Sequence, residues 1–144
     1  VILRLFLTYG PGQDTGRFLP KIICSCLNND TFPVSVGEQL RDFCYIDDTV
    51  SAIFKGLEKQ EVNGEVLNVA SGEPVKIRDM IEKVCALTGS GKPQYGKVSY
   101  RPGENMALYA NISKGKKILQ WEPTTNIDIG LQKTINYFDN KHHA

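Results

Sequence analysis

The chain has 144 residues, of which 41% are hydrophobic and 23% charged, and its formal net charge is +1 at pH 7. These values predict one globular domain and argue against a broadly basic surface for nucleic acid or membranes. The short basic run over 114–117 is typical of a solvated helix face. We therefore expect no nucleic-acid and no membrane partner, and a cytoplasmic protein without a signal peptide.

The first predicted element is a strand over residues 1–8, in which the apolar run is interrupted only by Arg4. Apolar residues on both faces predict that this strand lies between two layers. A glycine- and proline-containing turn over 9–12 ends the strand. Residues 18–27 then repeat their apolar side chains at helical spacing, with Pro20 in the first turn, where proline is tolerated.

Two short strands are predicted next, over 34–36 and 43–46. Asp47 or Asp48 is then expected to cap a helix, because a carboxylate can accept hydrogen bonds from free N–H groups there. The apolar face of this helix is predicted to consist of Val50, Ile53, Phe54 and Leu57.

The second half continues the alternation of strands and helices, which predicts a mixed α/β fold. The elements expected are a buried strand over 66–70, a helix from Ile77 that stops at Gly89, a loop over 90–96, a strand over 97–100, a helix that Asn111 or Ser113 caps and that ends at Leu119, and a last helix carrying Ile127, Leu131, Ile135, Tyr137 and Phe138.

The four cysteines, Cys24, Cys26, Cys44 and Cys85, form no Cys-x-x-Cys pair. We expect free thiols rather than disulfides or a zinc site. His142 and His143, at the C-terminus, are poor candidates for catalysis. No catalytic residue and no metal ligand is therefore predicted in this chain.

The densest polar stretch is GEQLRDFCYIDD, residues 37–48. A metal or acid/base site on its carboxylates would need convergent partners, and a structural role is the favoured interpretation. Arg41 could present its planar guanidinium to a phosphate, although pairing with Asp42 or Glu38 on the surface is the simpler alternative. Arg101, in the turn Arg-Pro-Gly-Glu, is a second arginine that could help to clamp a diphosphate.

Several segments occur in a characteristic order: LRLFLTYGPGQ, RFLP, GEQLRDFCYIDD, LNVASGEPVKI, RPGE, NISKGKKILQWEP and IDIGLQKTINYF. Together they resemble the C-terminal half of the extended short-chain dehydrogenase/reductase family, the NAD-dependent nucleotide-sugar epimerases and dehydratases. The form of residues 37–43 is most similar to the branch that makes deoxysugars for surface polysaccharides, including CDP-linked dideoxyhexose enzymes. The resemblance implies that the family's glycine-rich loop and its catalytic Tyr-x-x-x-Lys would lie before residue 1, and no G-x-G-x-x-G occurs in the chain.

The resemblance implies the C-terminal portion of a Rossmann-type fold: two strands and helices of the large sheet, plus a small substrate-binding subdomain. Residues 1–144 would form the nucleotide-sugar-binding portion, with the dinucleotide-binding part absent. NAD(P) would serve the full-length family, and none is expected on this chain alone. The expected ligand is a CDP-, dTDP- or UDP-linked sugar.

The resemblance also assigns residues to the substrate. Arg41 and Arg101 would contact the diphosphate or ribose, and Glu104 would lie at a ribose hydroxyl or beside Arg101. Four apolar side chains would line the nucleotide pocket: Phe18, Leu19, Val34 and Val36.

Residues at the end of the first strand are assigned to the cofactor side. Tyr9, Gly10 and Pro11 would lie near the nicotinamide. Many family members have asparagine at position 7, in contact with the substrate, but this chain has Leu7, and Thr8 is the candidate replacement.

Two further expectations concern assembly. The alternative to an enzyme portion is a non-catalytic module that binds a partner chain or a nucleotide only. In either case the strands 1–8 and 66–70 would expose edges and apolar faces, so we expect a homo-oligomer or other self-association.

Overall fold

The computed structural model describes residues 1–142, so His143 and the side chain of His142 lie outside the described residues. The strands are β1 (Ile2–Leu5), β2 (Leu7–Tyr9), β3 (Thr31–Pro33), β4 (Leu40–Tyr45), β5 (Val66–Val69), β6 (Pro74–Lys76), β7 (Lys92–Gln94) and β8 (Ala107–Leu108). The helices are α1 (Phe18–Leu27), α2 (Ile46–Glu58), α3 (Ile77–Thr88), α4 (Ser113–Leu119) and α5 (Ile127–His142), with a 3₁₀ turn η1 (Gln60–Val62). The mixed α/β fold predicted from the alternation of elements is confirmed.

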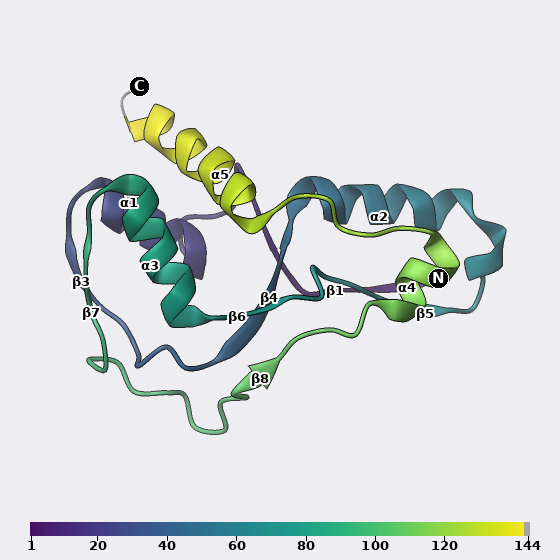
Figure 1. Cartoon of the computed structure of the whole chain (residues 1–144), viewed down its shortest axis with the longest axis horizontal. Helices are drawn as coiled ribbons and strands as arrows, with labels where there is room; N and C mark the ends of the chain where they lie inside the picture. The colour runs from purple at the N-terminus through teal and green to yellow at the C-terminus, as the bar shows by residue number, and fades with distance from the viewer. Residues whose placement is uncertain (143–144) are drawn as a thin grey trace.

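Strand β4 is the centre of the molecule (Figure 1). It pairs in parallel with β2 and β8 and antiparallel with β6. Two parallel pairs, β1 with β5 and β3 with β7, lie on either side of it. Because β4 belongs to the middle sheet, its side chains can face both of the regions that flank it.

Two hydrophobic clusters lie at opposite ends of the long axis. At one end α1 packs against α3 and α5, and α3 packs against α5 (Figure 1). At the other end α2 and α4 enclose β5, with Leu67, Leu119 and Trp121 at the centre. Successive side chains of a strand point to opposite faces, so Phe43 of β4 joins the first cluster and Cys44 the second.

The single strand predicted over 1–8 is wrong, because the chain forms two short strands there. After Leu5 it changes partner, from β5 to β4. The prediction that this segment lies between two layers is also wrong for the described residues. Ile2 is 61% exposed and Leu5 is 50% exposed, so the side chains of β1 are not covered by a layer on both faces of the strand.

The predicted strands over 34–36 and 97–100 are also wrong. The structure instead pairs β3 with β7, and β7 lies inside the segment that was predicted to be a loop. Beyond this pair the chain makes irregular contacts, in which the carbonyl of Val34 accepts hydrogen bonds from the N–H groups of Lys97 and Val98. Single-residue β-propensity does not identify which short segments find a partner.

Helix α2 differs from the prediction in its cap and in its buried face. It begins at Ile46 and has no side-chain cap, so Asp47 and Asp48 lie in its first turn. The small residues Ala52 and Gly56 face inward, and Gly56 lies beside the side chain of Leu3 of β1. The predicted apolar face is exposed instead: Val50, Ile53, Phe54 and Leu57.

The remaining helices follow the predicted periodicity. Helix α1 begins at Phe18, and α3 begins at Ile77 and ends at Gly89, whose φ of 69° is the left-handed conformation that glycine adopts readily. Ile112 occupies the cap position of α4 without a side-chain bond, while Asn111 accepts a hydrogen bond from the Ser113 N–H. Within residues 1–142, every helix is too short or too polar to cross a membrane.

Candidate functional site

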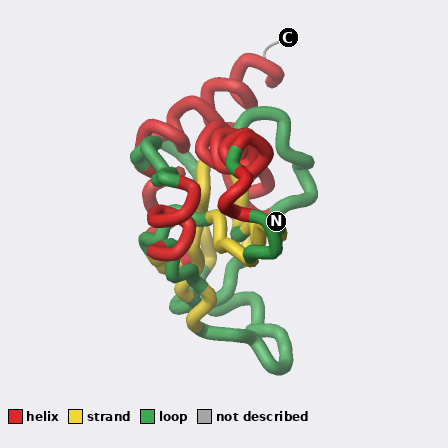
Figure 2. The backbone as a smooth tube through the Cα atoms, turned by 90° about the vertical axis from the view of Figure 1, so that its right-hand side faces the viewer, coloured by secondary structure: helices red, strands yellow, loops and turns green. Residues whose placement is uncertain are grey.

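A cavity with a mostly apolar wall lies between the helices α1 and α3 and the long loop that joins β7 to β8. Its volume is about 580 Å³, within the range of roughly 300–1,000 Å³ that is usual for small-molecule sites. The loop projects away from the helices at the bottom of Figures 1 and 2. Apolar side chains form most of the wall: Phe18, Ile22, Phe32, Val34, Ile77, Ile81 and Val98.

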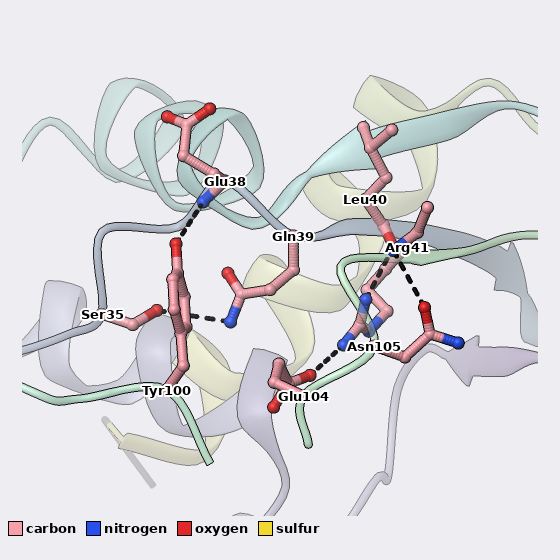
Figure 3. Close-up of polar contacts among 9 residues, drawn as sticks. Ser35, Glu38, Gln39, Leu40, Arg41, Tyr100, Glu104 and Asn105 are labelled. Carbon is pink, nitrogen blue, oxygen red and sulfur yellow. Dashed lines mark hydrogen bonds and ion pairs between the residues drawn. The ribbon is translucent and has the colours of Figure 1, made fainter. Parts of the chain in front are cut away.

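Arg41 reaches this cavity from β4, and its side chain is only 13% exposed. One guanidinium nitrogen donates to the backbone carbonyl of Leu40 at 2.8 Å, and another donates to the carboxylate of Glu104 (Figure 3). The pairing with Asp42 or Glu38 considered from the sequence is not the one formed. Asp42 points to the opposite face of β4, and Glu38 pairs with Lys76 at 2.8 Å.

The predicted Arg-Pro-Gly-Glu turn positions this partner. The Glu104 N–H donates to the Arg101 carbonyl at 3.0 Å, and Gly103 has a φ of 72°. Proline at the second position and glycine at the third are the residues that a type II turn favours. The turn therefore places Arg101 and Glu104 on the same cavity wall, but the carboxylate of Glu104 pairs with Arg41 rather than with Arg101.

Sequence reasoning missed a third cation, Lys21 on α1, which also lines the cavity. Phe18, Lys21, Ile22 and Ser25 follow the spacing i, i+3, i+4, i+7 and so share one helix face. That spacing was the signal that could have identified Lys21 and Ser25. Three cationic side chains and one carboxylate line the cavity, so its field favours an anion.

Other polar groups of the wall were also missed. The Gln39 amide lies near Ser35, with 3.5 Å between Nε2 and Oγ, and the Tyr100 hydroxyl accepts a hydrogen bond from the Glu38 N–H (Figure 3). Asn105, next to Glu104, accepts a hydrogen bond from the Ala107 N–H. Of these contacts, the one between Glu38 and Tyr100 joins the β7–β8 loop to the segment that precedes β4.

The predicted apolar wall residues divide into two groups. Phe18 and Val34 line the cavity. Leu19 points into the core and is 3% exposed, whereas Val36 is 44% exposed and lies outside the lining. Thr8 hydrogen-bonds the Thr49 hydroxyl at 3.2 Å and lines a neighbouring hollow, while Leu7 lines both that hollow and the cavity.

Tyr9, Gly10 and Pro11, the candidates for the cofactor side, lie away from this cavity. Tyr9 is buried among aromatic side chains, its hydroxyl donates to the Ile127 carbonyl at 3.4 Å, and burial raises its pKa. A Cβ on Gly10 would lie 2.4 Å from Ile46. Tyr9 and Gly10 thus form packed interior rather than an open cradle, and no step of cofactor chemistry is assigned to them.

The two buried carboxylates of the polar stretch, Asp42 and Asp48, accept hydrogen bonds from backbone N–H groups. Asp42 accepts hydrogen bonds from the N–H and hydroxyl groups of Ser71 at 2.7 and 2.6 Å, and from the N–H groups of Gly72 and Ala110. Asp48 accepts three from Thr124 and Thr125. Among residues 1–142, no group of three or more His, Cys, Asp or Glu side chains is arranged to hold a metal.

Comparisons with known proteins identify the family to which the sequence and the fold are similar. Residues 1–70 match the family model described as the NAD dependent epimerase/dehydratase family. A UDP-glucuronic acid 4-epimerase from Bacillus cereus, solved with UDP-glucuronic acid and NAD, is 33% identical, and the match covers 98% of this chain and 45% of that chain with a TM-score of 0.88. The chain belongs to the NAD-dependent epimerase/dehydratase family.

Two curated relatives in this family carry descriptive names. CDP-abequose synthase from Salmonella muenchen is 32% identical over 93% of this chain and 46% of its own length. The low-salt glycan biosynthesis protein Agl12 from Haloferax volcanii is 30% identical over 96% of this chain and 44% of its own length. The chain thus spans somewhat less than half the length of these epimerase/dehydratase relatives.

Proposed function

We propose that this chain recognises nucleotide-diphosphate sugars, as the substrate-binding portion of an NAD(P)-dependent sugar epimerase or dehydratase of deoxysugar and surface-polysaccharide biosynthesis. The observation that carries the proposal is the guanidinium of Arg41. It is fixed by the Leu40 carbonyl and the Glu104 carboxylate at the wall of a cavity that Arg101 also lines. A planar, fixed guanidinium matches the oxygens of a phosphate.

The rest of the cavity has the chemistry that a nucleotide needs. Lys21 and Arg101 supply further positive charge for a diphosphate, and the apolar side chains of Phe18, Phe32 and Val34 supply a surface for the base. The B. cereus 4-epimerase structure contains a UDP-sugar, and the name of the Salmonella relative refers to a CDP-linked product. These names support the class of ligand proposed.

Turnover is proposed to require more than this chain. The reaction would oxidise the sugar at C4 by hydride transfer to NAD(P), which a dinucleotide-binding half would hold. No G-x-G-x-x-G loop occurs in the sequence, and its one Tyr-x-x-x-Lys spacing, Tyr137 to Lys141, lies near the end of α5. An NAD-dependent conversion of a nucleotide sugar by the purified 144-residue chain would contradict this part of the proposal.

The test of recognition is a calorimetric titration of the chain with UDP, CDP and dTDP, repeated with Arg41→Ala and Arg101→Ala. Each substitution is expected to weaken binding by about 10–100-fold, since a hydrogen bond to a charged group contributes roughly 1.5–3 kcal/mol. Arg4→Ala is the matched control, because Arg4 is exposed on β1 and lies outside the cavity. If none of the nucleotides binds, or if the control loses as much affinity, the proposal fails.

A second candidate function is a non-catalytic module that binds a partner chain. Exposed apolar residues favour it, because Phe54 and Leu57 on α2 are 59% and 76% exposed. The same titration separates the two functions, since a module that binds only protein would give no heat with any nucleotide.

A further inference from the structure

Two thiols that are 59 residues apart in the sequence meet between α1 and α3. The Sγ atoms of Cys26 and Cys85 are 3.6 Å apart, and both side chains are free thiols. The other two cysteines lie elsewhere: Cys24 is half-buried on a different face of α1, and Cys44 packs in the opposite hydrophobic cluster. The contact between Cys26 and Cys85 therefore arises from the packing of two helices.

The geometry of this contact is close to that of a disulfide. A disulfide bond is about 2.05 Å long, so the sulfur atoms need to approach by roughly 1.5 Å, within the reach of small side-chain rotations. Gly91 packs directly against Cys26, because a Cβ at Gly91 would lie 2.5 Å from the Cys26 Sγ.

The two thiols differ in their accessibility to solvent. Cys85 is half-buried on α3, whereas Cys26 is fully buried in the core. Burial raises the pKa of the Cys26 thiol, and its place in the core keeps dissolved oxidants away from the sulfur atom. An oxidant therefore meets Cys85 first, with Cys26 behind it as the neighbouring thiol.

We propose that Cys26 and Cys85 form a reversible disulfide when a peroxide oxidises Cys85. The Cys85 sulfur attacks the peroxide O–O bond and becomes a sulfenic acid, and one water leaves with the thiol proton. The Cys26 sulfur then attacks the sulfenic sulfur, the S–S bond forms, and the hydroxyl leaves with the Cys26 proton as a second water. Two thiols are oxidised by two electrons, and one hydrogen peroxide is reduced to two waters.

The bond would join two helices that line the same cavity. Helix α1 contributes Phe18 and Ile22 to the wall, and α3 contributes Ile77 and Ile81. A covalent link between Cys26 and Cys85 would restrict the movement of these helices relative to each other. The inference concerns the thiol chemistry itself and does not depend on which ligand the cavity takes.

Peptide mapping of the full chain tests the proposal. The reduced protein is treated with hydrogen peroxide, alkylated in denaturant and digested with trypsin, which places Cys26 in peptide 22–41, Cys85 in peptide 84–97 and Cys44 in peptide 42–55. Peptide 22–41 is expected to be linked to peptide 84–97. The four thiols per chain are expected to fall to two, and dithiothreitol is expected to restore them.

Variants identify the sulfur atoms involved. Cys24 shares a peptide with Cys26, so Cys24→Ser is expected to retain the link, while Cys85→Ser, at a half-buried position, is expected to lose it. Non-reducing electrophoresis is expected to show a monomer. A link to peptide 42–55, a disulfide-linked dimer, or sulfinic acid on Cys85 without any link would each overturn the proposal, and the wild-type map is decisive even if a variant does not fold.

Discussion

The guanidinium of Arg41 on β4 donates to the carboxylate of Glu104, which lies 63 residues later in the chain. The bond joins the central strand to the β7–β8 loop at the wall of the cavity. It also helps to fix the orientation of Arg41, because a second guanidinium nitrogen donates to the Leu40 carbonyl.

Substitution of Glu104 with glutamine separates the effect of its negative charge from the effect of its hydrogen bond with Arg41. Glu104→Gln keeps an oxygen that accepts from Arg41 but removes a negative charge from the cavity. We expect the affinity for CDP, UDP or dTDP to rise by about 3–10-fold at low salt, because the ligand no longer competes with a carboxylate. Titration calorimetry measures the change, and a lower affinity would show instead that Glu104 itself contacts the nucleotide.

Asp42 is expected to be a major determinant of stability. Its buried carboxylate accepts hydrogen bonds from residues 71, 72 and 110, so Asp42→Ala leaves several buried donors without a partner. The free energy of unfolding should fall by about 2–4 kcal/mol, measured by urea denaturation.

The matched control for that substitution is Asp47→Ala. Asp47 is exposed in the first turn of α2, where its charge interacts favourably with the helix dipole. The substitution Asp47→Ala should lower the free energy of unfolding by less than about 1 kcal/mol. Equal losses for Asp42→Ala and Asp47→Ala would contradict the buried network.

The stability of the reduced protein should fall in alkaline solution. Burial raises the pKa of the Cys44 thiol from 9.0 to about 11. Between these values the unfolded state loses a proton that the folded state retains, so the free energy of unfolding falls as the pH rises, by at most about 1.4 kcal/mol per pH unit. Cys44→Ala removes this contribution.

Urea denaturation of the wild type and of Cys44→Ala, in the presence of a reductant, measures the effect between pH 8 and pH 10. The wild type should lose more stability than the variant over this range, although Cys26 contributes a loss of the same sign in both proteins. A difference between the two proteins that is independent of pH would contradict the assignment to Cys44.

The exposed apolar face of α2 should drive self-association. Phe54 and Leu57 project from this face, and Phe54→Glu combined with Leu57→Glu is expected to reduce concentration-dependent assembly in light scattering. Ile129→Glu, at an exposed position on α5, is the control and should leave assembly unchanged. A wild-type chain that remains monomeric at all concentrations would contradict this prediction.

The sequence by itself determined the elements whose signal is local. The helical spacing of residues 18–27 and 77–88 predicted α1 and α3, and the Arg-Pro-Gly-Glu turn was evident from its proline and glycine. The alternation of side chains along β4 also separates Arg41 from Asp42, so their placement on opposite faces could have been read from the strand alone.

Only the tertiary structure decided the contacts that depend on distant partners. The apolar spacing of α2 was present in the sequence, but in the folded chain the small residues Ala52 and Gly56 face inward, and Phe54 and Leu57 lie outside. The pairing of Arg41 with Glu104, and the contact of Cys26 with Cys85, likewise required the folded chain. Local propensity fixes where a helix or turn forms, whereas the choice among distant partners is made by the packing of whole elements.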